Sequence, residues 1–111
     1  MKYGPGEFFE RHRDGCFSTH QIKPDEPEER SHLTIQVYLS SSADLVGGDT
    51  TFYGQWGSHN ESDNELPVEP IPGRVLVFQH RQLLHSGGVV TSGEKIVVRS
   101  DIMYKNIEAD L

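Results

Sequence analysis

The sequence has 111 residues, of which 34% are hydrophobic and 24% charged, and its formal net charge is −7 at pH 7. This length suits one domain with a single core, so we expect one domain over residues 1–111. The acidic balance disfavours a nucleic-acid partner, and no apolar run reaches membrane-spanning length. The lone cysteine, Cys16, excludes an internal disulfide, and the polar N-terminus is unlike a secretory signal. These features predict a cytoplasmic or nuclear protein without a nucleic-acid or membrane partner.

Short β-type runs closed by turn residues follow one another along the chain, which predicts an all-β protein. In chain order, the expected strands are 8–14, 33–39, 49–53, 68–71, 74–80, 84–90 and 96–104. In the clearest run, 33–39, Leu33, Ile35, Val37 and Leu39 share one face, and Thr34, Gln36 and Tyr38 share the other. The polar stretches 23–30 and 54–65 are expected to be loops, and only 105–111 has helical character.

The pattern His12-Arg13-Asp14 is a candidate metal-binding pair. Residues two apart on a strand point to the same side, so His12 and Asp14 aim an imidazole and a carboxylate at one point. Two histidines and one carboxylate hold Fe(II) on one octahedral face and leave positions open for other ligands. The chain has 6 histidines, so the pair alone is weak evidence, and a structural or exposed role stays open.

Five motifs follow one another in the order found in a known family. Residues 3–14 match Y-x-x-G-x-x-F-x-x-H-x-D, 34–39 match T-x-x-x-Y-L, 47–52 match G-G-x-T-x-F, 73–78 match G-x-x-x-x-F, and 85–95 match H-x-G-x-x-V-x-x-G-x-K. In these motifs the chain resembles the prolyl 4-hydroxylase-like Fe(II)/2-oxoglutarate-dependent oxygenases. The resemblance extends over nearly the whole chain, from Tyr3 to Tyr104.

The resemblance implies a double-stranded β-helix, which is a jelly-roll relative of the cupins. Such domains have N-terminal helices and a first strand before the position of Tyr3, and this chain opens there. It could be an excised catalytic core, a truncated product, or a chain that completes its sheet with a partner. Because an open sheet edge is normally covered or paired, we expect marginal stability or an oligomer.

The same resemblance makes His12, Asp14 and His85 the catalytic iron ligands. Zinc or manganese could occupy the same site in a preparation. His80, five residues before His85, is the alternative distal ligand. The histidines that match no ligand position are expected at the surface or rim: His20, His32, His59 and His80.

The resemblance places 2-oxoglutarate on the iron, with its far carboxylate on Lys95 and Tyr38. A buried carboxylate needs a cation and a hydrogen-bond donor. Arg99 shares a strand face with Lys95, and its guanidinium can bind a carboxylate through two N–H groups. Position favours Lys95, and Arg99 remains the alternative cation. Tyr3 and Thr50 are expected to line the pocket.

The implied activity is hydroxylation of a C–H bond, with release of succinate and CO2 from 2-oxoglutarate and with ascorbate as a candidate reductant. The expected substrate is a prolyl or other peptide side chain, or a small molecule. Two alternatives stay open: a non-catalytic or degenerate metal-binding jelly roll, and a cupin-type metalloenzyme that does not use 2-oxoglutarate. The 23–30 loop is expected to flank the pocket mouth and close over substrate.

Overall fold

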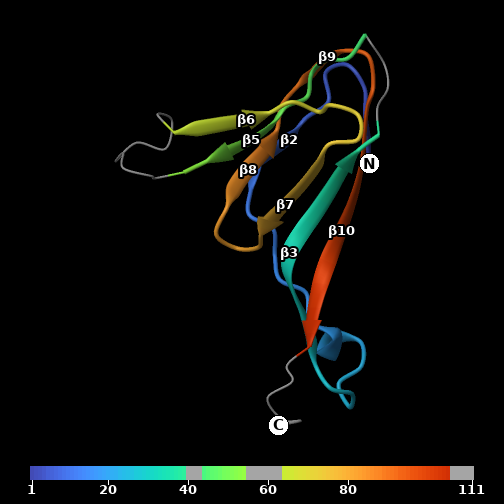
Figure 1. Ribbon diagram of the computed structural model, residues 1–111, viewed down its shortest axis with the longest axis vertical. Coiled ribbons are helices and arrows are strands. Elements are labelled where there is room, and N and C mark those ends of the chain that lie inside the picture. Colours follow the sequence, from blue (N-terminus) through green and yellow to red (C-terminus); the bar gives the residue numbers. More distant parts are fainter. Residues whose placement is uncertain (40–43, 55–63, 106–111) are drawn as a thin grey trace.

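The computed structural model describes residues 1–39, 44–54 and 64–105, and nearly every element in them is a β-strand (Figure 1). The strands are β1 (Lys2–Tyr3), β2 (Phe9–His12), β3 (Glu29–Tyr38), β4 (Val46–Gly47), β5 (Thr50–Tyr53), β6 (Glu65–Val68), β7 (Val75–Gln79), β8 (Leu84–Gly87), β9 (Val90–Ser92) and β10 (Lys95–Lys105). The helical element of these residues is a single 3-10 turn, η1 (Thr19–Gln21). No helix in the described ranges is long and apolar enough to cross a membrane.

The strands form two four-stranded antiparallel sheets and one small ribbon. The first sheet has the order β1-β10-β3-β7, the second has the order β2-β8-β5-β6, and β4 pairs with β9 in the ribbon. In Figure 1 the long strands β3 and β10 lie side by side, and the second sheet extends away from them. The chain passes from β6 in the second sheet to β7 in the first, then to β8 in the second and β10 in the first. This winding between two sheets is the all-β, jelly-roll arrangement expected from the sequence.

Most of the expected strands are present, with several differences. The strand expected at 8–14 ends at His12, so Asp14 follows the strand and does not lie on it, and β3 begins at Glu29, inside the expected 23–30 loop. The prediction of a strand at 68–71 is wrong, because β6 (Glu65–Val68) ends there and the next residues form the Pro72-Gly73 turn into β7. Pro70 and Pro72 lack the N–H groups that a continued strand would need. The expected strand at 84–90 is divided into β8 and β9 near Gly88, whose N–H donates to the Asp49 carbonyl at 2.7 Å. Most of the segment expected to have helical character, 106–111, lies outside the described residues.

The two sheets enclose an interior that is mainly polar. Among the described residues, five apolar side chains are buried: Tyr38, Phe52, Phe78, Val90 and Val97. In the same ranges, eight buried side chains are polar or charged: Asp14, Ser31, Thr34, Gln36, Thr50, His80, His85 and Lys95. Because buried polar groups are costly unless they have partners, this interior is built around a site and not as a simple hydrophobic core.

Strand β3 shows how this interior arises. Its polar face, with Thr34, Gln36 and Tyr38, is the buried one, whereas the residues of its apolar face are only partly covered. The neighbouring Val77 and Val98 on the outer side of the first sheet are 53% and 49% exposed. The outer face of this sheet is therefore apolar and open, and the stability of the chain depends on a few inward-facing rings.

Phe78 and Val77 allow a direct test, since they are adjacent in β7 and face opposite sides. The Phe78 ring packs against Phe52 and His85, with ring centroids 5.1 and 4.8 Å apart. We expect Phe78→Ala to lower the free energy of unfolding by about 3–5 kcal/mol. The half-exposed Val77→Ala should cost about 1 kcal/mol or less. Urea denaturation followed by circular dichroism measures both, and equal losses would show that the outer face is buried in solution.

Candidate metal centre

Two distant histidines meet because of the register between β2 and β8. His12 at the end of β2 is the direct partner of His85 in β8, and Phe52 of β5 flanks His85 on its other side. Asp14 lies just after β2, where its carbonyl accepts from the Arg81 N–H at 2.8 Å. One potential ligand atom from each of His12, Asp14 and His85 lies within 4.8 Å of the other two. The expected triad is thus brought together in space.

Both imidazoles are oriented in the same way. The Nδ1 of His12 bonds to the Glu10 carbonyl at 2.7 Å, and the Nδ1 of His85 bonds to the Leu83 carbonyl at 2.9 Å. Since a carbonyl oxygen can only accept, each ring carries a proton on Nδ1, and Nε2 is the nitrogen that is free to bind a metal. These two Nε2 atoms lie 3.3 and 3.5 Å from the same oxygen of Asp14, Oδ1.

Two imidazole nitrogens and a carboxylate that face one another are satisfied together by a cation between them. Asp14 and His85 are nearly inaccessible, and the buried Nε2 of His85 has no hydrogen-bond partner among the described residues. Burial also lowers the pKa of His85, against the opposing effects of Leu83 and Asp14, which favours the neutral imidazole that a metal needs. Ligands bound at about 2.1 Å in octahedral positions lie about 3.0 Å apart, close to the separations found here. The donor set therefore fits a divalent metal ion.

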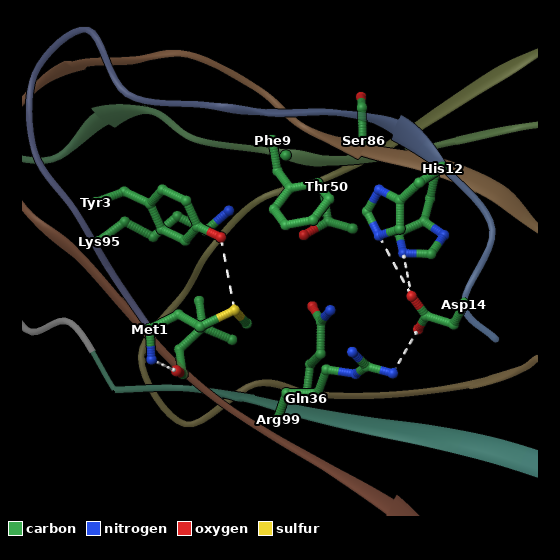
Figure 2. Close-up of a pocket in the computed structure, with 13 residues that line it drawn as sticks. Met1, Tyr3, Phe9, His12, Asp14, Gln36, Thr50, Ser86, Lys95 and Arg99 are labelled. Carbon is green, nitrogen blue, oxygen red and sulfur yellow. Dashed lines mark hydrogen bonds and ion pairs between the residues drawn. The ribbon is translucent and has the colours of Figure 1, made fainter. Parts of the chain in front are cut away.

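The second oxygen of Asp14 is also engaged. Its Oδ2 accepts a hydrogen bond from the Thr34 hydroxyl at 2.8 Å and lies 3.5 Å from Nη2 of Arg99. Arg99 in turn donates to Asp101 at 3.3 Å. Figure 2 shows Arg99 directed toward Asp14, at the metal end of the pocket.

The opposite end of the pocket contains Lys95, which is only 4% exposed. Its ammonium lies 5.4 Å from the ring centre of Tyr3 and 5.9 Å from that of Tyr38, whose hydroxyl is hydrogen-bonded to Thr50. In the part of the chain that the structure describes, no carboxylate forms an ion pair with this ammonium. Burial lowers the pKa of Lys95, partly offset by the Asp49 charge. A buried ammonium without a counter-ion points to an anionic ligand.

Of the two glycines that open the G-G-x-T-x-F motif, Gly48 makes room for this lysine. Gly47 and Gly48 both have positive φ, 81° and 79°. A Cβ on Gly47 would clash with the Val89 carbonyl oxygen, and one on Gly48 would lie 3.1 Å from Cδ of Lys95. Glycine therefore suits the left-handed backbone at both positions, and at Gly48 it also allows the close approach of the lysine stem.

A family model described as the 2OG-Fe(II) oxygenase superfamily matches residues 1–100. The chain belongs to this superfamily. Its members use Fe(II) and 2-oxoglutarate, which confirms the metal and co-substrate expected from the sequence. A search of curated proteins gives no match.

Solved structures of this superfamily share the fold of the present oxygenase chain. A prolyl-4-hydroxylase from Pseudomonas putida matches with a TM-score of 0.62 and 20% identity, over 92% of this chain and 49% of the other. An oxidoreductase of the 2OG-Fe(II) oxygenase family from Burkholderia pseudomallei matches with a TM-score of 0.58 and 15% identity, over 90% of this chain and 38% of the other. The chain thus spans about half or less of the length of these proteins, and the likeness shows the jelly-roll fold.

The oxygenase pocket contains nearly all the residues singled out in the sequence. Its lining includes His12, Asp14, His85, Tyr3, Thr50, Lys95 and Arg99. Tyr38 lies behind Thr50 and reaches the pocket through their hydrogen bond. The two alternative cations are at different ends, Lys95 beside the tyrosines and Arg99 beside Asp14.

His80 lies elsewhere and is not part of the metal-binding group. It is buried between Ser31, whose hydroxyl is 3.2 Å from Nδ1, and Asp101, whose carboxylate is 3.6 Å from Nε2. His20 and His32 are exposed, and His59 lies outside the described residues. The expectation that His80 is an ordinary surface or rim histidine is wrong, because it is 5% exposed.

Thr34 and Gln36 are among the site residues that the sequence did not single out. Thr34 binds the metal-site carboxylate, and Gln36 lines the pocket. The alternation of the strand could have identified them, since both share the polar face of β3 with Tyr38, which was predicted to lie at the site.

The expectation that the 23–30 loop flanks the pocket mouth is not met. None of its residues lines the metal pocket, and several line a separate cavity with Thr19 and Lys105. Hydrogen bonds from Ser18 and Arg30 to Glu28, at 2.7 and 2.6 Å, tie the loop to its own flanks.

We expect metal binding to require all three members of the triad. His85→Ala or Asp14→Ala should weaken Co(II) binding by at least about 100-fold, because each removes a ligand from a three-ligand site. His32→Ala, on the exposed side of β3, is the matched control and should bind as wild type. Anaerobic titration calorimetry measures the affinity. A His85→Ala protein that still binds tightly, together with a His80→Ala protein that does not, would reassign the distal ligand.

The depressed pKa of Lys95 predicts a pH dependence of stability. Below its folded-state pKa, burying the charged ammonium destabilises the folded protein. The unfolded chain binds more protons between that pKa and the ordinary value of 10.5, so stability rises with pH there. The unfolding free energy of the wild type should therefore rise with pH in this window relative to that of Lys95→Met. A difference that stays flat in metal-free urea denaturation would mean that the ammonium is solvated.

Proposed function

We propose that residues 1–111 form one dioxygenase domain that couples oxidation of 2-oxoglutarate to hydroxylation of a substrate C–H bond. The observation that carries the proposal is one pocket with two complementary ends. Three potential metal ligands converge at one end, and at the other lies a buried ammonium that forms no ion pair with a carboxylate of the described residues. A metal ion and a dicarboxylate that chelates it together satisfy both ends.

His12, Asp14 and His85 are the side chains that would hold Fe(II). Bound there with 2-oxoglutarate, the metal supplies activation of dioxygen and release of succinate and CO2. The protein residues provide three ligands on one side and leave the side toward Lys95 for the co-substrate. The carbonyls of Glu10 and Leu83 bind the Nδ1 side of each ring and so keep both Nε2 atoms directed at Asp14.

Lys95 would bind the far carboxylate of 2-oxoglutarate. An ammonium and a carboxylate shielded from water form a strong charge-assisted bond. The hydroxyl groups of Tyr38 and Thr50 offer a further donor, and the Tyr3 ring covers the ammonium. Arg99 is unsuited to this role, since its guanidinium is turned to Asp14 and Asp101.

The substrate would approach from the metal end. There the side chains of His12 and Arg99 are 30% and 36% exposed, whereas Asp14 and His85 behind them are 3% exposed. A prolyl or other peptide side chain is the proposed substrate, supported by the fold shared with the Pseudomonas putida prolyl-4-hydroxylase. The shared length is about half of that protein, so the substrate is a proposal and not a consequence of the fold.

Succinate release tests the function, and Lys95→Met tests the co-substrate site. Wild-type protein with Fe(II), 2-oxoglutarate and oxygen should form succinate, at a higher rate with a peptide or small molecule found by screening. Loss of a buried charge partner costs about 2–5 kcal/mol, so Lys95→Met should weaken 2-oxoglutarate binding by tens to thousands of fold. Lys105→Met, at the exposed end of the same strand, is the control and should change nothing.

The outcomes separate the alternatives. A chain that binds metal and 2-oxoglutarate but forms no succinate with or without candidate substrates is a non-catalytic jelly roll. A chain that binds metal but not 2-oxoglutarate contradicts the proposed role of Lys95.

A further inference from the structure

Among the described residues, the second oxygen of the Asp14 carboxylate has two partners of different kinds. Asp14 presents Oδ1 to the two histidines, while Oδ2 receives the neutral Thr34 hydroxyl and faces the charged Arg99 guanidinium. Thr34 is completely buried, and the Arg99 side chain is 36% exposed. The two contacts therefore differ in charge, rigidity and solvent access.

Thr34 is held firmly in place. It lies in the middle of the first sheet, paired with Phe78 of β7 and Asp101 of β10. A β-branched side chain on a strand has restricted rotation, so the hydroxyl direction is set by the backbone. Its 2.8 Å bond to Oδ2 fixes the rotation of the carboxylate and leaves one oxygen, Oδ1, directed at the Nε2 atoms.

Arg99 affects the charge of the Asp14 carboxylate more than its orientation. Its distance of 3.5 Å from Oδ2 is that of an ion pair, and its hydrogen bond goes to Asp101. A positive charge this close to Asp14 compensates the carboxylate when no ion is bound and repels a divalent ion that arrives. Arg99 should thus oppose metal binding, although solvent exposure limits the size of the effect.

We propose that Thr34 and Arg99 are positioning residues with opposite effects on the metal centre. Thr34 keeps Asp14 a one-oxygen ligand and strengthens metal binding; Arg99 reduces the charge that Asp14 offers and weakens it. This inference rests on the metal site of the proposed function but requires no 2-oxoglutarate chemistry.

Thr34→Val and Thr34→Ser test the first half of the proposal. Valine keeps the volume and removes the hydroxyl, whereas serine keeps the hydroxyl. Loss of an outer partner of a ligand costs about 10–100-fold in metal affinity, which we expect for Co(II) binding to Thr34→Val. The visible spectrum of bound Co(II) should also change, because the second carboxylate oxygen can turn onto the ion. Thr34→Ser should restore both the affinity and the spectrum.

Arg99→Met tests the second half. Its Co(II) affinity should be several-fold higher than that of wild type at low ionic strength, and the difference should shrink as salt screens the charge. Thermal melting of each metal-free variant shows that the proteins are folded before titration. Wild-type affinity and spectrum in Thr34→Val would overturn the role of Thr34. Weaker binding in Arg99→Met would overturn the role of Arg99 and make it a second support of Asp14.

Metal binding and catalysis are tested separately. If the wild-type chain binds no Co(II), the metal site of the proposed function is wrong, and the positioning roles fall with it. If it binds Co(II) but forms no succinate, the positioning roles are still decided by the titrations.

Discussion

The structure depends on one electrostatic constraint, the meeting of two imidazole nitrogens and a carboxylate oxygen in a largely buried place. Asp14 Oδ1 lies 3.3 and 3.5 Å from the Nε2 atoms of His12 and His85, and a cation between the three groups satisfies all of them. The β2–β8 register and the two carbonyl contacts to Nδ1 hold this arrangement in place. A scaffold that holds these three groups together makes sense as a site prepared for a divalent ion.

The same logic applies at the other end of the pocket. The ammonium of Lys95 is buried beside two aromatic rings, and its desolvation is compensated only when an anion arrives. The pocket is thus charged in opposite senses along its length, with acceptors near Asp14 and a cation near Tyr38. A ligand that bridges the two ends must chelate a metal and carry a distant negative charge.

This polar interior has a structural consequence. The inward face of β3 is occupied by Thr34, Gln36 and Tyr38, so its apolar residues lie on the outer side of the sheet. Inward apolar packing comes chiefly from Phe52 and Phe78, which also pack around His85. The aromatic cluster therefore supports both the fold and the orientation of a metal ligand.

Local patterns in the sequence were enough to predict most of the strands. Alternation located β3 and β10, and turn residues located the start of β7, because strand periodicity and turn chemistry are local properties. The prediction of a strand at 68–71 was wrong because its apolar residues belong partly to the turn before β7. The predicted place of the 23–30 loop at the pocket mouth was wrong because a loop's position depends on where its flanking strands end in space.

The sequence by itself determined the superfamily, the all-β fold and the three candidate ligands that cluster in space, since motif spacing preserves these features. Only the tertiary structure decided that the polar face of β3 is the inner one, because period-two alternation defines two faces without saying which is buried. It also decided that Thr34 and Arg99 share one oxygen of Asp14, and that His80 pairs with Ser31 and Asp101 instead. Such contacts join residues on separate strands, and strand register in three dimensions, not sequence spacing, sets which side chains meet.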